Sequence, residues 1–343
     1  LYNTAEQDEF SRNTGAFNTN IAQQNSGIRL TSNAFSRKNT NVSSALQLYT
    51  NSARGWNNEL SIGYNTVEDE RILPLNTPEI AVAVTPIGGT SANRAVTFGS
   101  ERFSPGNLLK QRIFEISDNL TIPMGAHTFT AGARFERSYT YNYFLSGAAN
   151  GAYNFASIAD LAAGRPSGFL FSYANGGDIA AEFNAQQASL YAQDQWNYTP
   201  NLTLTYGPSF LDTPVLNQDL LTRSTAAGRA IRTDWKPETQ ILWSPRVGFN
   251  YNVKGESRTQ FRGNVGIYTA PVPLIMVGNA YSNTGLGGVN VACTGTAVPA
   301  FVTNVAELPR SCAGQNPPTP GAYLQRERRS ASSPAVMAGW LAD

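Results

Sequence analysis

The sequence is poor in charge and in histidine. Charged residues make up 14% of its 343 residues, against about 25% in soluble domains, and His127 is the single histidine. A single histidine rules out a multi-histidine metal site, and because His127 comes just after a tight turn we expect a solvated turn residue rather than a member of a histidine-based triad. The sequence therefore predicts a protein that is not an enzyme, with no catalytic residues, no metal site and no cofactor.

Long hydrophobic runs are also missing. No stretch reaches the roughly 18 apolar residues of a transmembrane helix, so residence in a membrane would need β-strands. The net charge of +1 argues against nucleic acid as the main partner, because a phosphate-binding surface needs an excess of basic residues. The chain opens at Leu1 without a signal segment, so we expect a processed chain or an internal piece of a longer protein.

Cysteine is rare. Cys293 and Cys312 lie in a stretch rich in Pro, Gly and Thr that has no periodicity. In that context a loop disulfide is favoured over a metal site, and it would fit an oxidising compartment.

Alternating polarity, by contrast, is abundant, and it is clearest at 188–210. Leu202, Leu204 and Tyr206 alternate with Thr203 and Thr205 after a Thr-Pro-Asn turn, and an equally alternating run precedes that turn. Side chains switch faces at every residue of a strand, so this stretch predicts a β-hairpin.

The same pattern predicts further hairpins and less regular N-terminal strands. The hairpins pair 43–50 with 56–69, 111–122 with 127–144, and 244–253 with 258–268, and the N-terminal strands are 5–11, 16–24 and 28–35. Long connections without a sustained period separate them, at 71–107, 145–187 and 211–242, and the chain from Thr269 onward is expected to be loop. Inside these loops we expect a short strand near 81–84 and a short helix around 157–163.

Short turns therefore alternate with long loops, so the short turns would all lie at one end of the strands. This asymmetry, with strands of about ten residues or more, is typical of outer-membrane barrels. The predicted fold is all-β: an antiparallel up-and-down transmembrane β-barrel with short periplasmic turns and long extracellular loops. A soluble β-sandwich is the alternative, although its strands are usually shorter and its long loops are not confined to one end.

Two sets of candidate residues follow from the alternation. The lipid-facing candidates are Leu202, Leu204, Tyr206, Phe249 and Tyr251. The lumen-facing candidates are Arg134, Glu136, Arg246 and Arg262, which would line a polar lumen or pair with one another; the pairing is favoured because interior charges in barrels are commonly networked.

Two segments carry a family resemblance. SLYAQDQWNYTPNLTLTYG at 189–207 and SPRVGFNYNVKGESRTQFRGNVGIYTAPVPLIMVGNAYSNTG at 244–285 resemble the barrel of TonB-dependent outer-membrane receptors, most closely the Oar-like branch. The resemblance covers roughly 16–322 and implies a barrel of about 22 strands, of which this chain would supply about half. The chain departs from the family pattern at Pro208, where proline cannot donate to a strand ladder. We also see no plug domain, TonB-contacting segment, regulatory-like β domain or final strand in this sequence.

The resemblance implies residence in the bacterial outer membrane, lipid contact, and import of an unknown solute that extracellular loops capture and that TonB-delivered energy moves. We divide the chain into a partial barrel at 1–322 and an irregular tail at 323–343, for which a truncation or frameshift is the hypothesis. The alternative function is a passive outer-membrane β-barrel or surface adhesin without active transport. A plug and TonB box in the parent gene would discriminate the two.

Overall fold

The computed structural model describes most of the chain. The described residues are 2–10, 28–85, 94–145, 147–174, 179–212, 241–253, 259–269 and 288–317, with short pieces at 215–217, 224–226 and 229–231 and single residues at 274, 278 and 282. Within these residues, no helix has the length and apolar character needed to cross a membrane.

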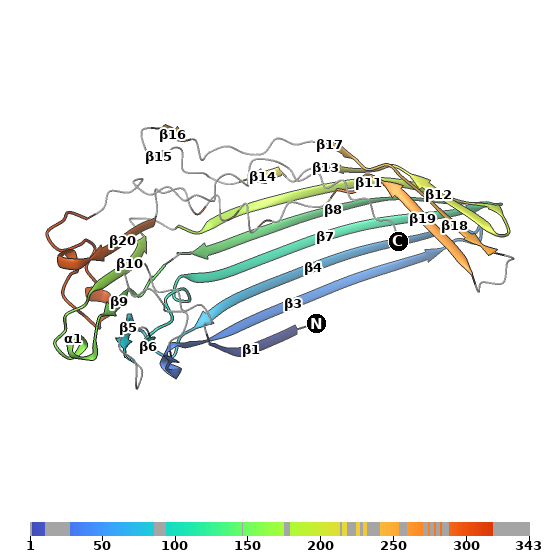
Figure 1. Ribbon diagram of the computed structural model, residues 1–343. Coiled ribbons are helices and arrows are strands. Elements are labelled where there is room, and N and C mark those ends of the chain that lie inside the picture. Colours follow the sequence, from blue (N-terminus) through green and yellow to red (C-terminus); the bar gives the residue numbers. More distant parts are fainter. Residues whose placement is uncertain are drawn as a thin grey trace.

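A long, curved antiparallel sheet dominates the molecule (Figure 1). Its strands follow the order β1-β3-β4-β7-β8-β11-β12-β18-β19, so neighbours in sequence are mostly neighbours in space. The bounds are β1 Tyr2–Phe10, β3 Ala34–Asn51, β4 Asn57–Ile72, β7 Asn107–Met124, β8 His127–Phe144, β11 Ala181–Thr199, β12 Leu202–Gly207, β18 Arg246–Asn252 and β19 Gln260–Gly266. Among the described strands, β1 and β19 end this order and do not pair with each other, so the sheet is not closed into a barrel.

Short connections join consecutive strands at one end of the long sheet. The β3–β4 turn occupies Ser52–Trp56, and the β7–β8 and β11–β12 turns have two residues each. Gly125 opens the β7–β8 turn with a φ of 64°, the left-handed conformation that two-residue hairpins favour and that glycine adopts without strain. The predicted hairpins at 43–69, 111–144, 188–210 and 244–268 are confirmed. β3, β7 and β11 extend beyond the predicted bounds, whereas β18 and β19 are shorter than predicted.

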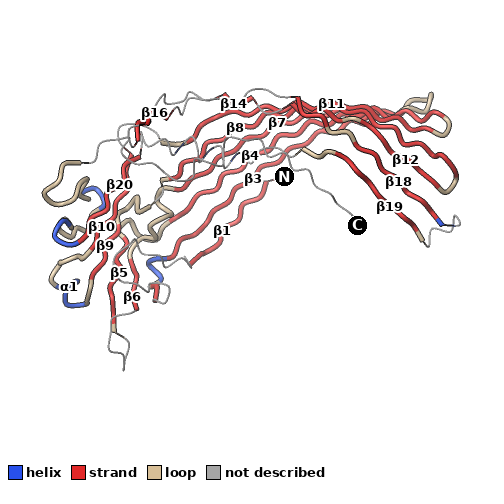
Figure 2. The backbone as a smooth tube through the Cα atoms, turned by 45° about the horizontal axis from the view of Figure 1, so that its top comes forward, coloured by secondary structure: helices blue, strands red, loops and turns tan. Residues whose placement is uncertain are grey.

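The long connections at the other end build a second sheet (Figure 2). Its order is β2-β6-β5-β9-β10-β20, and we call it the cap sheet. Its strands are β2 Ile28–Arg29, β6 Arg94–Phe98, β5 Glu79–Val84, β9 Ala152–Phe155, β10 Gly168–Ala174 and β20 Gly288–Thr294. Five of its strands come from connections between strands of the long sheet, and β20 follows the last of those strands. Segments far apart in sequence therefore pair with one another in the cap sheet.

The cap sheet corrects several sequence predictions. The connections at 71–107 and 145–187 are not long loops, since they contain β5, β6, β9 and β10, although the short strand near 81–84 and the helix α1, Ile158–Ala162, are confirmed. The stretch after Thr269 is not all loop either, because β20 lies in it. β5, β9 and β10 are short and buried along nearly their whole length, so they lack the alternation that reveals a half-exposed strand. β6 and β20 do alternate, but over only five and seven residues.

The N-terminal prediction was also partly wrong. The segment at 28–35 is not one strand: Ile28 and Arg29 pair with β6, a 3₁₀ turn covers Thr31–Asn33, and β3 begins at Ala34. The strand predicted at 16–24 lies outside the described residues. Within 211–242 the described pieces include the short strands β14 Val215–Asn217, β15 Ser224–Ala226 and β16 Arg229–Ile231; β13 Ser209–Asp212 and β17 Ile241–Trp243 border them, and β13, β14 and β17 join the long sheet.

Candidate functional site

The pairing register sorts the long sheet into two chemically different faces. Leu46, Ile62, Ile116 and Phe135 stand opposite one another across β3, β4, β7 and β8, and we call their side the apolar face. The next row over, Gln47, Ser61, Ser117 and Arg134, lies on the other side, the polar face. Directly paired residues in an antiparallel sheet point to the same side, so the alternation of each strand adds up across the whole sheet.

All nine face candidates from the sequence fall into these two sets. Leu202 pairs with Tyr251 and Leu204 with Phe249, and Tyr206 lies in the same alternation, so these five residues share the apolar face. Arg134, Glu136, Arg246 and Arg262 lie on the polar face.

An ion-paired cluster sits on the polar face of β7 and β8. Arg134 donates from Nη2 to Glu115 Oε2 at 2.6 Å and to Glu136 Oε2 at 2.7 Å. The structure thus brings Arg134 and Glu136 together, and it adds Glu115, which sequence reasoning missed. The signal that would have found Glu115 is the hairpin register, which places it directly opposite Glu136.

The other two predicted arginines stay apart from this cluster. Arg246 lies over the Tyr268 ring, with the guanidinium carbon 4.8 Å from the ring centroid. Arg262 is opposite Asn250, and the described residues give neither arginine an ion pair. Of the four lumen-facing candidates, the described residues show an ion pair between Arg134 and Glu136 and none for the other two.

His127 is not a solvated turn residue. It is the first residue of β8, its Nδ1 lies 2.8 Å from Asp194 Oδ2, and its ring stacks on Phe129 and Trp196. Tyr206 donates to the same carboxylate oxygen at 2.7 Å. This aromatic group lies next to the short turns, as the aromatic belt of a membrane strand would.

At the opposite end, the polar face is covered. Ala181, Phe183 and Ala185 of β11 are almost completely buried and pack with Leu274, and the neighbouring Ser138, Thr140 and Asn142 of β8 are buried as well. The apolar face of the same strands stays exposed at Arg137 and Gln186. Among the described residues, Leu274 and Gly278 therefore cover the polar face at this end.

The cap sheet has an aromatic core of its own. Tyr153 and Phe169 are fully buried, and Phe301 meets the rings of Tyr153 and Phe155 edge-on at 5.1 Å. Burial raises the pKa of Tyr153 to about 12, while its hydroxyl donates to the Ala300 carbonyl at 3.2 Å. Cys293 of β20 is joined to Cys312 by a disulfide, which ties the segment after β20 to this core.

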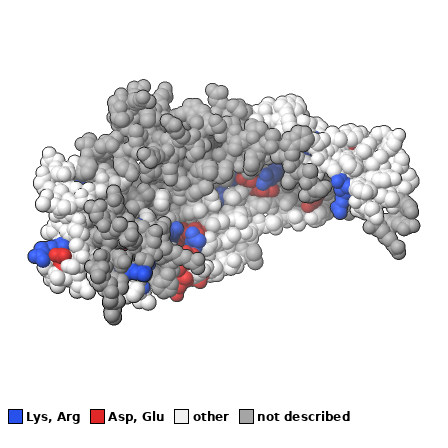
Figure 3. All heavy atoms as spheres, in the orientation of Figure 1, with Lys and Arg blue, Asp and Glu red and all other residues white. Residues whose placement is uncertain are grey.

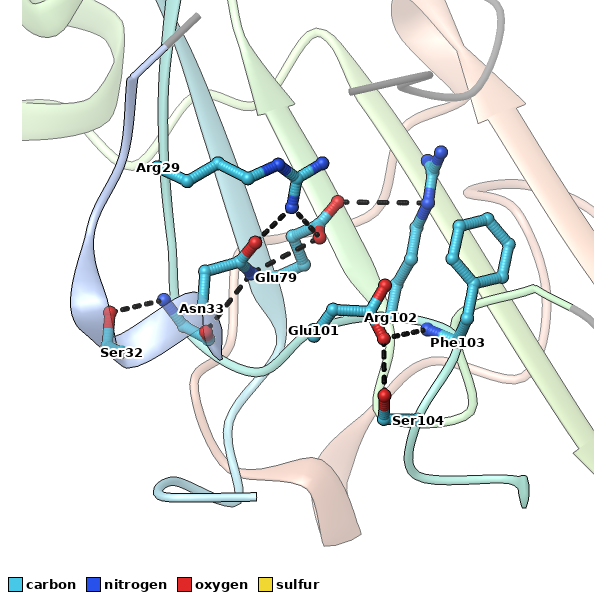
Figure 4. A network of polar contacts seen from close by, with 9 residues as sticks. Arg29, Ser32, Asn33, Glu79, Glu101, Arg102, Phe103 and Ser104 are labelled. Atoms are coloured by element: carbon cyan, nitrogen blue, oxygen red, sulfur yellow. Dashed lines mark hydrogen bonds and ion pairs between the residues drawn. The ribbon is translucent and has the colours of Figure 1, made fainter. Parts of the chain in front are cut away.

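A buried charge network lies where the cap sheet meets the start of β3 (Figure 4). Glu79 lies 3.5 Å from Arg29 Nη1 and 3.9 Å from Arg102 Nε, and Asn33 donates to it at 3.3 Å. Burial raises the pKa of Glu79 and lowers that of Arg102, and each group partly opposes the effect of burial on the other. Glu101 accepts from Ser104 Oγ and the Phe103 N–H, so the network fixes the turn after β6.

The site is thus the polar face of the long sheet, which is buried at one end, next to a cap sheet that contains a disulfide. On the side shown in Figure 3, acidic and basic side chains of the described residues lie next to one another in several places, and most of the described surface is uncharged. Across the described part of the chain, no three His, Cys, Asp or Glu residues are grouped to hold a metal ion. Such a surface offers hydrogen-bond donors and acceptors to a solute.

Comparison with known proteins gives one family. A model of the outer membrane beta barrel domain matches residues 2–338. No curated protein matches the sequence. Among solved structures, the outer membrane transporter YddB from Escherichia coli is similar at 13% identity and a TM-score of 0.49, over 86% of this chain. The chain spans 31% of the length of that transporter's chain.

Proposed function

Because the chain belongs to the outer membrane beta barrel domain family, we propose that it is the membrane-spanning part of a TonB-dependent transporter of the Oar-like branch. Its place is the outer membrane. The proposal has the apolar face in contact with lipid, the polar face lining the barrel interior, and an unknown solute imported with energy that TonB delivers.

The two-faced register carries this proposal. Outer-membrane strands alternate apolar and polar residues because one side meets hydrocarbon and the other meets water or protein. Here Leu46, Leu48 and Leu190 are 58–67% exposed on the apolar face, although a soluble sheet would bury such residues. Burying this surface in lipid removes it from water and stabilises the sheet.

The cap sheet is proposed as the capture surface. It is built from the long connections, which lie outside the cell when the short turns are periplasmic. The disulfide and the aromatic core give it a fixed shape, so a solute would meet a preformed surface rather than disordered loops.

The open sheet supports the further proposal that the chain supplies about half of a barrel of about 22 strands. Unpaired strand edges are unfavourable in lipid, so we expect further strands of the parent protein to pair with β1 and β19. The partial barrel at 1–322 and the tail at 323–343 remain predictions, and the tail lies outside the described residues. The proposed role is binding and transport without catalysis.

Two experiments test the proposal. First, the full chain should insert into lipid vesicles and run as a heat-modifiable band, whereas a protease-resistant monomer in plain buffer would contradict the membrane placement. Second, solute uptake by cells expressing the parent protein should stop when TonB is deleted. Uptake that persists without TonB would indicate a passive barrel, and surface binding without uptake would indicate an adhesin.

A further inference from the structure

Two arginines lie on the apolar face, at the side of Ile116 and Phe135 that is farther from the short turns. Arg112 of β7 stands opposite Tyr139, and Arg137 of β8 stands opposite Phe114, so the two arginines are diagonal neighbours on adjacent strands. Both are exposed. Toward the short turns the same rows continue with Ile116 and Phe135, which are apolar.

The arginines differ from the other basic residues on this face. Farther toward the cap, Lys110 is paired with Glu68 at 2.9 Å and Lys38 with Glu70 at 3.1 Å. In the part of the chain that the structure describes, neither Arg112 nor Arg137 has an ion pair with a carboxylate. Arg112 instead lies 5.4 Å from the centroid of the Tyr139 ring.

The nearby carboxylate of Glu182, toward the cap sheet, already has a hydrogen-bond partner. Glu182, opposite Tyr141, accepts a hydrogen bond from Tyr139 Oη at 2.9 Å. Gln186, which is exposed, stands opposite Arg137 and adds an amide donor to the same patch. Two guanidiniums and an amide therefore face outward together.

We propose that Arg112 and Arg137 bind the phosphate of an anionic lipid in the outer leaflet, with its acyl chains lying against Phe114, Ile116 and Phe135. A guanidinium matches phosphate oxygens with two parallel hydrogen bonds, and an arginine at the edge of the hydrocarbon reaches the headgroup level. Charge complementarity selects an anionic lipid over a zwitterionic one. This inference rests on the membrane placement proposed above.

The test uses the full chain folded in zwitterionic detergent micelles, with binding followed by native mass spectrometry. The probes are phosphatidic acid, phosphatidylcholine with the same acyl chains, and inorganic phosphate. Phosphatidic acid should bind about tenfold or more tightly than phosphatidylcholine. The double variant Arg112→Gln/Arg137→Gln should lose that preference, while Arg54→Gln in the exposed turn at the other end of the sheet should keep it.

Several outcomes would overturn the inference. These are equal binding of the two lipids to the unmodified chain, a double variant that keeps its preference, or an equal loss in Arg54→Gln. Inorganic phosphate binding as tightly as the lipid would also refute it, because the acyl chains would then contribute nothing. If the double variant fails to fold, equal binding of phosphatidic acid and phosphatidylcholine to the unmodified chain would still refute the inference. A chain that never inserts into vesicles refutes the membrane placement instead.

Discussion

Gly99 lies against the backbone of Pro78: a Cβ on Gly99 would come within 2.1 Å of the Pro78 carbonyl oxygen. Gly99 also has a φ of 81°, and its own carbonyl accepts from Asn33 in the buried charge network. We expect Gly99→Ala to destabilise the cap sheet by about 2 kcal/mol or more, because it adds left-handed strain and a clash with backbone. Limited proteolysis of the cap in detergent measures the loss.

Gly164→Ala is the matched control, since Gly164 has a φ of 63° but nothing within 4 Å of a built Cβ. It should cost only the conformational strain, roughly 1 kcal/mol. An equal loss in the two variants would mean that the contact with Pro78 is unimportant.

The membrane placement predicts opposite effects at two adjacent positions of β4. Ile62 lies on the apolar face between Leu46 and Ile116, and Ser61 lies on the polar face between Gln47 and Ser117. Ile62→Arg should destabilise the protein in lipid vesicles by about 2–4 kcal/mol, while Ser61→Arg should have a small effect. Urea titration of the inserted protein gives both values, and a larger loss for Ser61→Arg would reverse the assignment of the faces.

The ion-paired cluster around Arg134 predicts that substitutions at Arg134 and Glu115 have non-additive effects on the free energy of unfolding. Removing the guanidinium in Arg134→Met leaves Glu115 and Glu136 facing each other without a cation, so we expect a loss of about 1 kcal/mol at these half-exposed positions. Adding Glu115→Gln should recover part of that loss, and a double-mutant cycle in urea quantifies it. Arg262→Met is the control because no ion pair of Arg262 is found among the described residues; a similar loss there would exclude a specific network.

The disulfide between Cys293 and Cys312 predicts that its removal destabilises the segment after β20 and leaves the long sheet folded. It closes a segment with a sequence separation of 19, for which loop-closure entropy corresponds to about 3 kcal/mol. Replacing both cysteines with alanine should expose 295–312 to protease and leave the amides of β7 and β8 protected in hydrogen exchange. Loss of protection throughout the long sheet would show that the cap and the sheet unfold together.

The raised pKa of Tyr153 predicts that the cap sheet becomes less stable at alkaline pH. Its pKa rises from 10.0 to about 12 on folding, so the folded state holds the phenol proton more tightly than the unfolded state does. The resulting stabilisation is complete below pH 10 and disappears as the pH rises toward about 12. Thermal unfolding followed by near-ultraviolet circular dichroism should show this decline, and Tyr153→Phe should lack it. The same slope in the variant would assign the decline to other groups.

The sequence by itself determined the main strands of the long sheet, because apolar and polar residues alternate along most of them. That alternation is a period of two in the residues of β7, β8 and β11, and the short turns carry their own signals, such as Gly125. The assignment of Leu204 and Arg134 to opposite faces needed only this alternation and the register of the hairpins.

Only the tertiary structure decided the cap sheet and its contacts. Strands such as β9 and β10 are buried on both sides, so their sequences show no alternation, and their partners lie as far away as β20. Glu79, Arg29 and Arg102 likewise form one network although they come from three separate segments. Contacts of this kind depend on which long connections fold over the sheet, and local periodicity carries no information about that.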